Sequence, residues 1–209
     1  MTCFRSTLPV LVMALAAPVA LAQDAGLYEN VANPDATFVR VVDAGTEVAI
    51  IQNASFDSVE SGVTPYVVID GETEVKIVSG ETTVTEAVKP ATFYSFVVGA
   101  DGTSALITDK ITNNPAQADV TFYNLSDIPS ADLYVPQAKA VAIEGVAAND
   151  GGSVALKAPL TLDFEVRQGE EVLASLSAID LKRRAGVAIV FSGTAGAYEV
   201  TAAPNAVAK

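Results

Sequence analysis

Histidine and tryptophan are absent from this chain of 209 residues, and its single cysteine is Cys3. These absences remove the usual general base, the usual zinc ligands and any thiol nucleophile beyond position 3. A hydrolase of the Ser-His-Asp type is therefore excluded. Two carboxylates could still hydrolyse a glycosidic bond, but no pair of acids stands out from ordinary solvated strand faces. The sequence thus predicts no enzyme, no metal site and no cofactor.

The first 22 residues have the pattern of a secretory signal peptide. Arg5 precedes an apolar run that is shorter than the roughly 20 residues needed to cross a membrane, and the run ends in small residues. This pattern predicts cleavage between Ala22 and Gln23 and export to a bacterial periplasm. Because Cys3 lies well upstream of the cleavage point, we expect the exported chain to have no lipid anchor, thiol or disulfide.

Acidic residues greatly outnumber basic ones. The chain has 12 Lys and Arg against 25 Asp and Glu, and loss of Arg5 leaves 11 against 25, a net charge of −14. This charge argues against nucleic acid as a partner, because phosphate contacts need a basic surface. It also repels a polyanion such as a uronic acid polysaccharide at long range, so that any contact with one should be weak and local.

The chain is rich in short runs of Val, Thr, Tyr and Phe, punctuated by Gly, Asp, Asn and Pro. This pattern is typical of an all-β sandwich or barrel. Residues 73–77 and 162–167 alternate between apolar and polar side chains, which predicts half-buried strands. Asp70 and Gly71 predict the two-residue turn of a hairpin, and the cluster NDGG at residues 149–152 predicts another turn.

A weak internal repeat divides the chain into two halves. The run FVRVVDA from Phe38 resembles DVTFYNL from Asp119, and VKIVSGET resembles FEVRQGEE with Gly80 aligned to Gly169. We therefore predict two tandem β-sandwich domains of similar topology joined by a short linker. The expected parts are a signal peptide (1–22), an N-terminal extension (23–33), domain 1 (34–111), the linker (112–117), domain 2 (118–203) and a flexible tail (204–209).

Lys182, Arg183 and Arg184 form a basic cluster against the acidic background. The favoured interpretation is a turn or edge whose positive charge discourages strand-to-strand aggregation. The alternative is a site for an anionic polymer or an acidic partner, acting within a Debye length of about 8 Å.

The six tyrosines bear on carbohydrate binding, which usually needs exposed aromatic rings. Those within apolar runs and expected in the core are Tyr66, Tyr94 and Tyr123. Those better placed for exposure are Tyr28, Tyr134 and Tyr198. A single exposed face carrying both the basic cluster and Tyr198 would support a carbohydrate-binding module.

The stretch LYENVANPDATFVRVVDA, directly after the signal peptide, resembles the start of the mature proteins of the alginate O-acetylation family AlgF. Members begin with Leu-Tyr, a short spacer containing proline, and a Phe-Val-Arg strand that ends in Asn-Ala. The matching positions here are Leu27, Tyr28, Pro34, Phe38, Val39, Arg40, Asp43 and Ala44. Asp43 stands where the family pattern has Asn, which adds a charge.

The resemblance implies a non-catalytic periplasmic adaptor required for O-acetylation of alginate. Such an adaptor would link a membrane-bound O-acyltransferase to periplasmic acetylation enzymes of the SGNH-hydrolase type. Two other classes of function stay open beside it. One is a carbohydrate-binding module, and the other is a structural or adhesive subunit whose residues 23–34 form a strand that is donated to a neighbour.

The candidate partner-binding residues are Leu27, Tyr28 and Arg40. Leu27 and Tyr28 are expected to pack onto domain 1 as a strap, and a docking peptide for a partner is the second interpretation. Phe38 is expected in the core of domain 1. By strict alternation Arg40 shares its face, so Arg40 needs an acidic partner or a position at the rim unless a bulge shifts the register.

Overall fold

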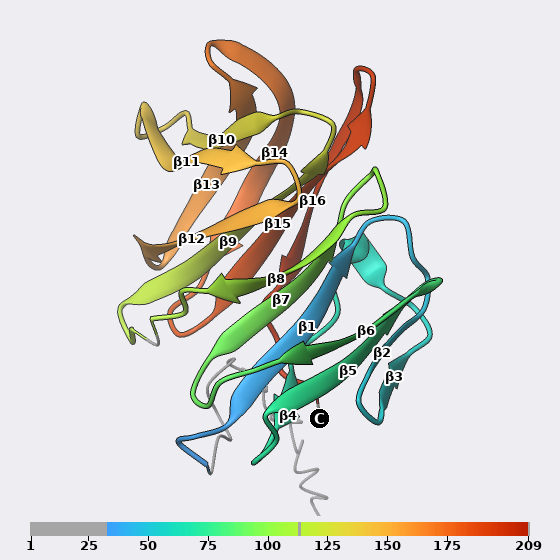
Figure 1. Ribbon diagram of the computed structural model, residues 1–209. Coiled ribbons are helices and arrows are strands. Elements are labelled where there is room, and N and C mark those ends of the chain that lie inside the picture. Colours follow the sequence, from blue (N-terminus) through green and yellow to red (C-terminus); the bar gives the residue numbers. More distant parts are fainter. Residues whose placement is uncertain (1–32, 113, 209) are drawn as a thin grey trace, which may run out of the picture.

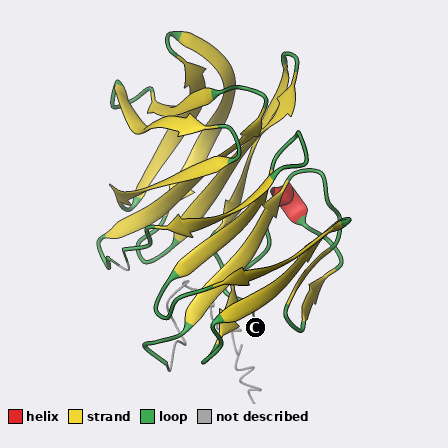
Figure 2. Ribbon diagram, viewed as in Figure 1, coloured by secondary structure: helices red, strands yellow, loops and turns green. Residues whose placement is uncertain are grey.

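The structure is a computed structural model that describes residues 33–112 and 114–208, and strands make up most of these residues (Figure 2). The first half contains β1 (Thr37–Asp43), β2 (Ala49–Ile51), β3 (Ala54–Phe56), η1 (Glu60–Gly62), β4 (Val67–Ile69), β5 (Glu74–Ser79), β6 (Thr82–Ala87), β7 (Phe93–Val98) and β8 (Ser104–Asp109). The second half contains β9 (Gln117–Ser126), β10 (Ser130–Val135), β11 (Ala140–Ala147), β12 (Asp150–Lys157), β13 (Leu160–Gln168), β14 (Glu171–Leu181), β15 (Gly186–Thr194) and β16 (Ala197–Pro204). The predicted all-β class is confirmed.

The two halves have the same topology. In domain 1 the strand orders are β4-β1-β7-β8 and β3-β2-β5-β6, and in domain 2 they are β12-β9-β15-β16 and β11-β10-β13-β14. Each strand of the first half thus corresponds to the strand eight places later. The unusual feature is also shared, because β1 pairs parallel with β7 and β9 pairs parallel with β15. The prediction of two similar sandwiches is confirmed.

The repeat holds at the level of single turns. Gly80 lies in a two-residue loop between paired residues Ser79 and Thr82, and Gly169 lies in the equivalent loop between Gln168 and Glu171. Their φ angles are 55° and 62°. An L side chain rarely adopts this conformation, so glycine is favoured at both turns.

Each sandwich has a core of its own, built by the alternation that the sequence indicates. Val75 and Ile77 of β5 are buried in domain 1, while Glu74 and Lys76 are exposed. Phe164 and Val166 of β13 are buried in domain 2. The predicted half-buried strands are confirmed.

The sheets β4-β1-β7-β8 and β12-β9-β15-β16 pack against each other, so the four sheets form a stack (Figure 1). A hydrophobic cluster joins them, with Val42, Val63 and Val97 from domain 1 and Tyr123, Leu125, Ala188 and Val190 from domain 2. The strand β1 is buried along its whole length, because one face meets its own core and the other meets the neighbouring domain. Burial on both faces explains why the apolar runs FVRVV and VTFY do not alternate.

The expected hairpin at Asp70 and Gly71 is wrong. The strand before this turn, β4, pairs with β1, and the strand after it, β5, pairs with β2 and β6 in the other sheet. The segment therefore crosses between the two sheets of domain 1. A turn signal marks where the chain reverses but does not say which strand becomes the hydrogen-bonded partner.

The cluster at residues 149–152 contains a turn, but its two glycines lie in strand β12 and pair with β9. A Cβ at Gly151 would lie 2.7 Å from Cδ1 of Tyr123, and a Cβ at Gly152 would collide with Ile143. The glycines therefore permit close packing rather than a chain reversal. Only Asn149, with a φ of 61°, has a turn conformation that favours glycine.

The prediction of a flexible tail at residues 204–209 is wrong for residues 205–208. Asn205 is buried, and Val207 forms a parallel bridge with Tyr66 of domain 1. The Tyr66 N–H donates to the Ala206 carbonyl, and the Ala208 N–H donates to the Tyr66 carbonyl, both at 2.8 Å. Backbone hydrogen bonds and one buried amide hold this segment, although its apolar surface is small.

Candidate functional site

The main polar site of the described residues lies in the seam between the two domains, centred on Arg40 in the middle of β1. The faces of β1 alternate, with Val39 and Val41 in the core of domain 1. Arg40 therefore points the other way, toward domain 2, and its exposed fraction is 0%. Phe38 shares this outer face and is buried with Tyr66, Phe93 and Val207 in a hydrophobic cluster separate from that of Val39 and Val41.

Each nitrogen of the Arg40 guanidinium donates a hydrogen bond. Nε donates to Ser95 Oγ at 2.8 Å on the adjacent strand β7. Nη1 donates to Asn205 Oδ1 at 2.6 Å, and Nη2 donates to Thr121 Oγ1 at 3.0 Å and to the Tyr123 hydroxyl at 2.6 Å. Three of these four partners belong to the second half of the chain. One side chain of domain 1 thus binds two residues of β9 and one residue of the C-terminal segment.

Asp109, at the end of β8, supplies the opposite charge. Its Oδ2 accepts hydrogen bonds from the Tyr66 hydroxyl at 2.7 Å and from Ser95 Oγ at 2.6 Å. Its Oδ1 accepts a hydrogen bond from the Tyr123 hydroxyl at 2.6 Å. Arg40 Nη2 lies 3.7 Å from Asp109 Oδ2. The expectation that Arg40 needs an acidic partner is confirmed.

Burial shapes the protonation of the seam. It raises the pKa of the Tyr66 and Tyr123 phenols, with Asp109 adding to the effect and Arg40 opposing it. Burial acts to lower the pKa of Arg40, but the neighbouring Tyr123, Tyr66 and Asp109 more than offset it, and the pKa is raised overall. Arg40 therefore stays charged and both phenols stay neutral at ordinary pH. The Arg40 guanidinium also lies 4.3 Å from the centre of the Tyr66 ring, a cation-π geometry.

This arrangement is suited to joining the domains rather than to catalysis. Among the residues that the structure describes, no buried side-chain nitrogen or oxygen lacks a hydrogen-bond partner, and no group of three metal-ligating side chains gathers. Ser95 and Asp109 resemble a nucleophile with a base, but Ser95 is fully buried and its hydroxyl is engaged by Arg40. A substrate has no access to it.

Arg40, predicted as a partner-binding residue, must therefore be reassigned. Its guanidinium is enclosed by both domains and is not available to a surface partner. The other predicted partner-binding residues, Leu27 and Tyr28, and the predicted cleavage site at Ala22 and Gln23 lie outside the described residues.

The basic cluster Lys182, Arg183 and Arg184 lies in the exposed turn between β14 and β15. Arg183 Nε donates to the Ala158 carbonyl at 3.1 Å, and the Arg184 N–H donates to the Gln117 carbonyl at 3.2 Å. The cluster therefore sits at a turn, as the favoured interpretation expects. Tyr198 pairs with Gly193 near the opposite end of β15. The single face that would have supported a carbohydrate-binding module is not formed by these residues.

The tyrosines divide as predicted where the structure describes them. Tyr66, Tyr94 and Tyr123 are buried. Tyr134 and Tyr198 are partly exposed, but both have partners. The Arg167 guanidinium stacks 3.6 Å from the centre of the Tyr134 ring, and the Tyr198 hydroxyl donates to Asp127 at 2.9 Å.

Sequence reasoning missed Asp109 and Asn205 as functional parts of the seam. Neither belongs to a motif, and Asn205 lies 165 residues from Arg40. The available signal was indirect: an arginine inside an apolar run requires an acid somewhere, but only the fold identifies which acid.

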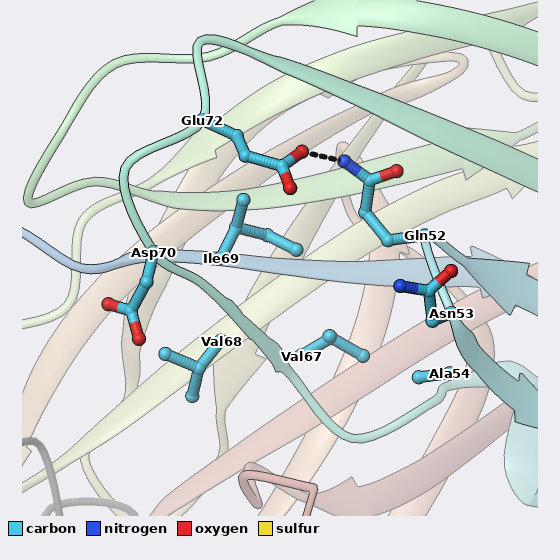
Figure 3. Close-up of a pocket in the computed structure, with 8 residues that line it drawn as sticks. All are labelled: Gln52, Asn53, Ala54, Val67, Val68, Ile69, Asp70 and Glu72. Carbon is cyan, nitrogen blue, oxygen red and sulfur yellow. Dashed lines mark hydrogen bonds between the residues drawn. The ribbon is translucent and has the colours of Figure 1, made fainter.

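A surface groove of about 370 Å³ lies between β4 and the turn from β2 to β3 (Figure 3). Its lining residues are Gln52, Asn53, Ala54, Val67, Val68, Ile69, Asp70 and Glu72. Gln52 Nε2 donates to Glu72 across the groove, as the dashed line in Figure 3 marks.

No helix in the described part of the chain is long and apolar enough to span a membrane.

Together, the fold and the seam define a protein of two repeated β-sandwiches locked to each other by a buried arginine-aspartate pair. A family model described as "Alginate O-acetyl transferase AlgF" matches residues 10–189. The chain therefore belongs to the AlgF family, which is implicated in alginate O-acetylation, and the predicted resemblance is confirmed.

The solved structures that are similar to part of the chain include the C-terminal domain of AlgF from P. aeruginosa. The similarity has 19% identity and a TM-score of 0.38, and it covers 43% of this chain and 98% of that domain. No curated protein matches the chain.

Proposed function

We propose that this protein is a non-catalytic periplasmic adaptor required for O-acetylation of alginate. It would link a membrane-bound O-acyltransferase to periplasmic acetylation enzymes of the SGNH-hydrolase type. The observation that carries the pathway is the family match over residues 10–189. The predicted signal peptide at residues 1–22 supports the periplasmic location.

The family description contains the word transferase, so a catalytic role is the alternative to weigh. Acyl transfer needs an accessible nucleophile and a base that activates it. Histidine is absent from the whole chain, and the Ser95–Asp109 pair is closed off inside the seam. These facts favour an adaptor that works through protein surfaces.

The exposed turn at Lys182, Arg183 and Arg184 is our candidate contact for an acidic partner or, weakly, for the polymer. The net charge of the whole chain is −13, so binding at this turn would have to act at short range. Arg40 is no longer a candidate for a contact with a partner, and for Leu27 and Tyr28 a docking peptide is the second interpretation after packing onto domain 1.

Deletion of the gene tests the proposal in the producing organism. We expect alginate to be secreted in normal amount but with little acetyl ester, because the donor and acceptor enzymes are no longer linked. The acetyl content per uronate, measured with and without a plasmid copy of the gene, reports this. Normal acetylation in the deletion strain would refute the proposal.

The adaptor role is separated from catalysis by testing the purified protein. It should capture SGNH-type acetylation enzymes but should not transfer acetyl groups from an activated ester to alginate oligomers. Transfer by the purified protein alone would make it an enzyme.

The basic turn is tested by changing all three residues to Glu. A matched control changes the exposed residues Lys76, Lys89 and Lys139 to Glu, which alters the net charge equally. Loss of enzyme capture or polymer affinity only in the first variant supports the contact. If the two variants have the same enzyme capture and polymer affinity, the turn is not a contact site. It would then have only the role of discouraging strand-to-strand aggregation.

A further inference from the structure

We propose that the groove on domain 1 is the binding site of the chain's own N-terminal segment, with Leu27 and Tyr28 as the side chains that enter it. The occupant is residues 23–32 of the same molecule, which precede the first described residue. This inference does not depend on the pathway in which the protein acts.

The chain leaves the described structure at the wall of the groove. Asn33 Nδ2 donates to Asp70 Oδ1 at 2.9 Å, and Asp70 is one of the lining residues. The Asn33 side chain also accepts the Asp35 N–H at 2.9 Å, and its carbonyl accepts the Ala36 N–H at 3.2 Å. Hydrogen bonds of the side chain and of the carbonyl thus hold Asn33 in place. The segment that precedes Asn33 therefore starts beside the groove.

The length of the preceding chain fits the distance to be covered. Tyr28 and Leu27 lie five and six residues before Asn33, and an extended chain advances about 3.3–3.6 Å per residue. The reach is therefore roughly 17–21 Å. The three residues of β4 that line the groove span only about 10 Å.

The chemistry of the groove suits neutral, largely apolar side chains. Val67 and Val68 of β4 and Ala54 of β3 supply aliphatic surface, and Val68 is 38% exposed. The polar lining includes the uncharged Asn53. The carboxylates of Asp70 and Glu72 already accept hydrogen bonds from Asn33 and Gln52, and their charge repels a polyuronate. Leucine offers an apolar body, and tyrosine adds a hydroxyl that an amide can bind.

The edge of β4 gives the segment a backbone partner as well. Both main-chain groups of Tyr66, just before β4, pair with residues 206 and 208 of the C-terminal segment. Main-chain groups two residues apart point the same way, so those of Val68 face the same edge as those of Tyr66. An extended N-terminal segment would continue the cover of this edge, which otherwise invites pairing with another chain.

A cysteine pair tests the occupant directly, because the chain from Gln23 onward has no cysteine of its own. We expect the L27C V68C variant of this chain to form an intramolecular disulfide under mild oxidation. The matched control is L27C V172C, since Val172 is 48% exposed but lies in domain 2. Non-reducing electrophoresis and peptide mass mapping distinguish the products.

Each outcome of the oxidation decides the proposal. An intramolecular bond in the groove pair, at least tenfold more abundant than in the control, supports it. Disulfide-linked dimers alone would assign the groove to a second copy of the chain. Equal yields of the intramolecular disulfide in the two variants would show that the segment has no fixed binding site. Either result overturns the proposal.

A peptide assay gives a second measurement that needs no cysteine. The chain is shortened to begin at Asn33, and a peptide of residues 23–32 is titrated into it. We expect binding that weakens at least tenfold when Leu27 and Tyr28 of the peptide are both changed to Ala. Absence of binding, or equal binding of the two peptides, would contradict the proposal and leave the groove to a protein partner.

Discussion

At the scale of the residue, the decisive feature is a charged side chain with no exposure to water. Burying an isolated charge costs far more than an ordinary side chain contributes to stability, so it is tolerated only when paired and hydrogen-bonded. Arg40 meets this condition with four hydrogen bonds and with Asp109. The planar guanidinium suits this role better than an ammonium, because its five donors point in fixed directions.

Changing Arg40 to Met should lower the free energy of unfolding by about 3–5 kcal/mol, because Asp109 is left buried without its cation. Urea unfolding monitored by circular dichroism measures this. The matched control is Arg167→Met, which removes a partly exposed arginine paired with Glu165 and should cost about 1 kcal/mol or less. An equal decrease in the free energy of unfolding of the two variants would show that the buried Arg40 contributes no more to stability than the partly exposed Arg167.

At the scale of the element, the two central strands β1 and β9 carry the architecture. Each has a parallel and an antiparallel neighbour, and each is buried on both faces. Their ends are also alike. The Gly45 N–H donates to the Asp43 side chain, and the Ser126 N–H donates to the Asn124 side chain. Asp43, where the family pattern has Asn, thus makes the same turn contact as its counterpart Asn124.

The C-terminal segment is the element whose role the sequence hid most completely. Truncation after Pro204 should lower the free energy of unfolding by about 2–3 kcal/mol, because Arg40 loses the Asn205 acceptor inside the seam. The same urea titration measures the loss. The full-length chain is the control. A truncated chain as stable as the control would mean that the segment is dispensable.

At the scale of the whole molecule, the four sheets are stacked (Figure 1). Hydrophobic clusters lie within each of the two sandwiches and between them. The polar seam lies beside the cluster between the sandwiches, and Tyr123 belongs to both. Unfolding either domain would therefore expose the charges that the other helps to cover. The halves are similar in topology but depend on one another for the burial of this seam.

The seam also predicts how stability depends on pH. Burial raises the pKa of Tyr66 and Tyr123 in the folded state, while in the unfolded chain both phenols titrate near about 10. Above that pH the unfolded state releases protons that the folded state retains. The stabilisation is therefore complete below a pH of about 10 and is lost as the pH rises toward the folded pKa values, by up to about 1.4 kcal/mol per pH unit for each tyrosine.

Urea titrations at a series of pH values from 8 to about 11 check this dependence. The Tyr123→Phe variant removes one of the two buried phenols and should show a smaller slope, whatever its stability at neutral pH. A free energy of unfolding that stays constant across this range would contradict the assignment of both phenols to the buried seam.

The sequence by itself determined the all-β class, the repeat and the faces of the half-buried strands, because alternation and turn residues are local properties of the chain. It also determined which chemistry is missing, since a residue type absent from the chain cannot be supplied by folding. It showed that Arg40 needs an acid, because that requirement follows from the apolar neighbours of Arg40.

Only the tertiary structure decided where that acid lies, that Phe38 faces the C-terminal segment, and that residues 205–208 are held in place. It also decided that β4 and β5 belong to different sheets. The physical reason is common to all four. Each depends on contacts between segments far apart in the chain, such as the 165 residues between Arg40 and Asn205, and such contacts are fixed by the packing of whole sheets.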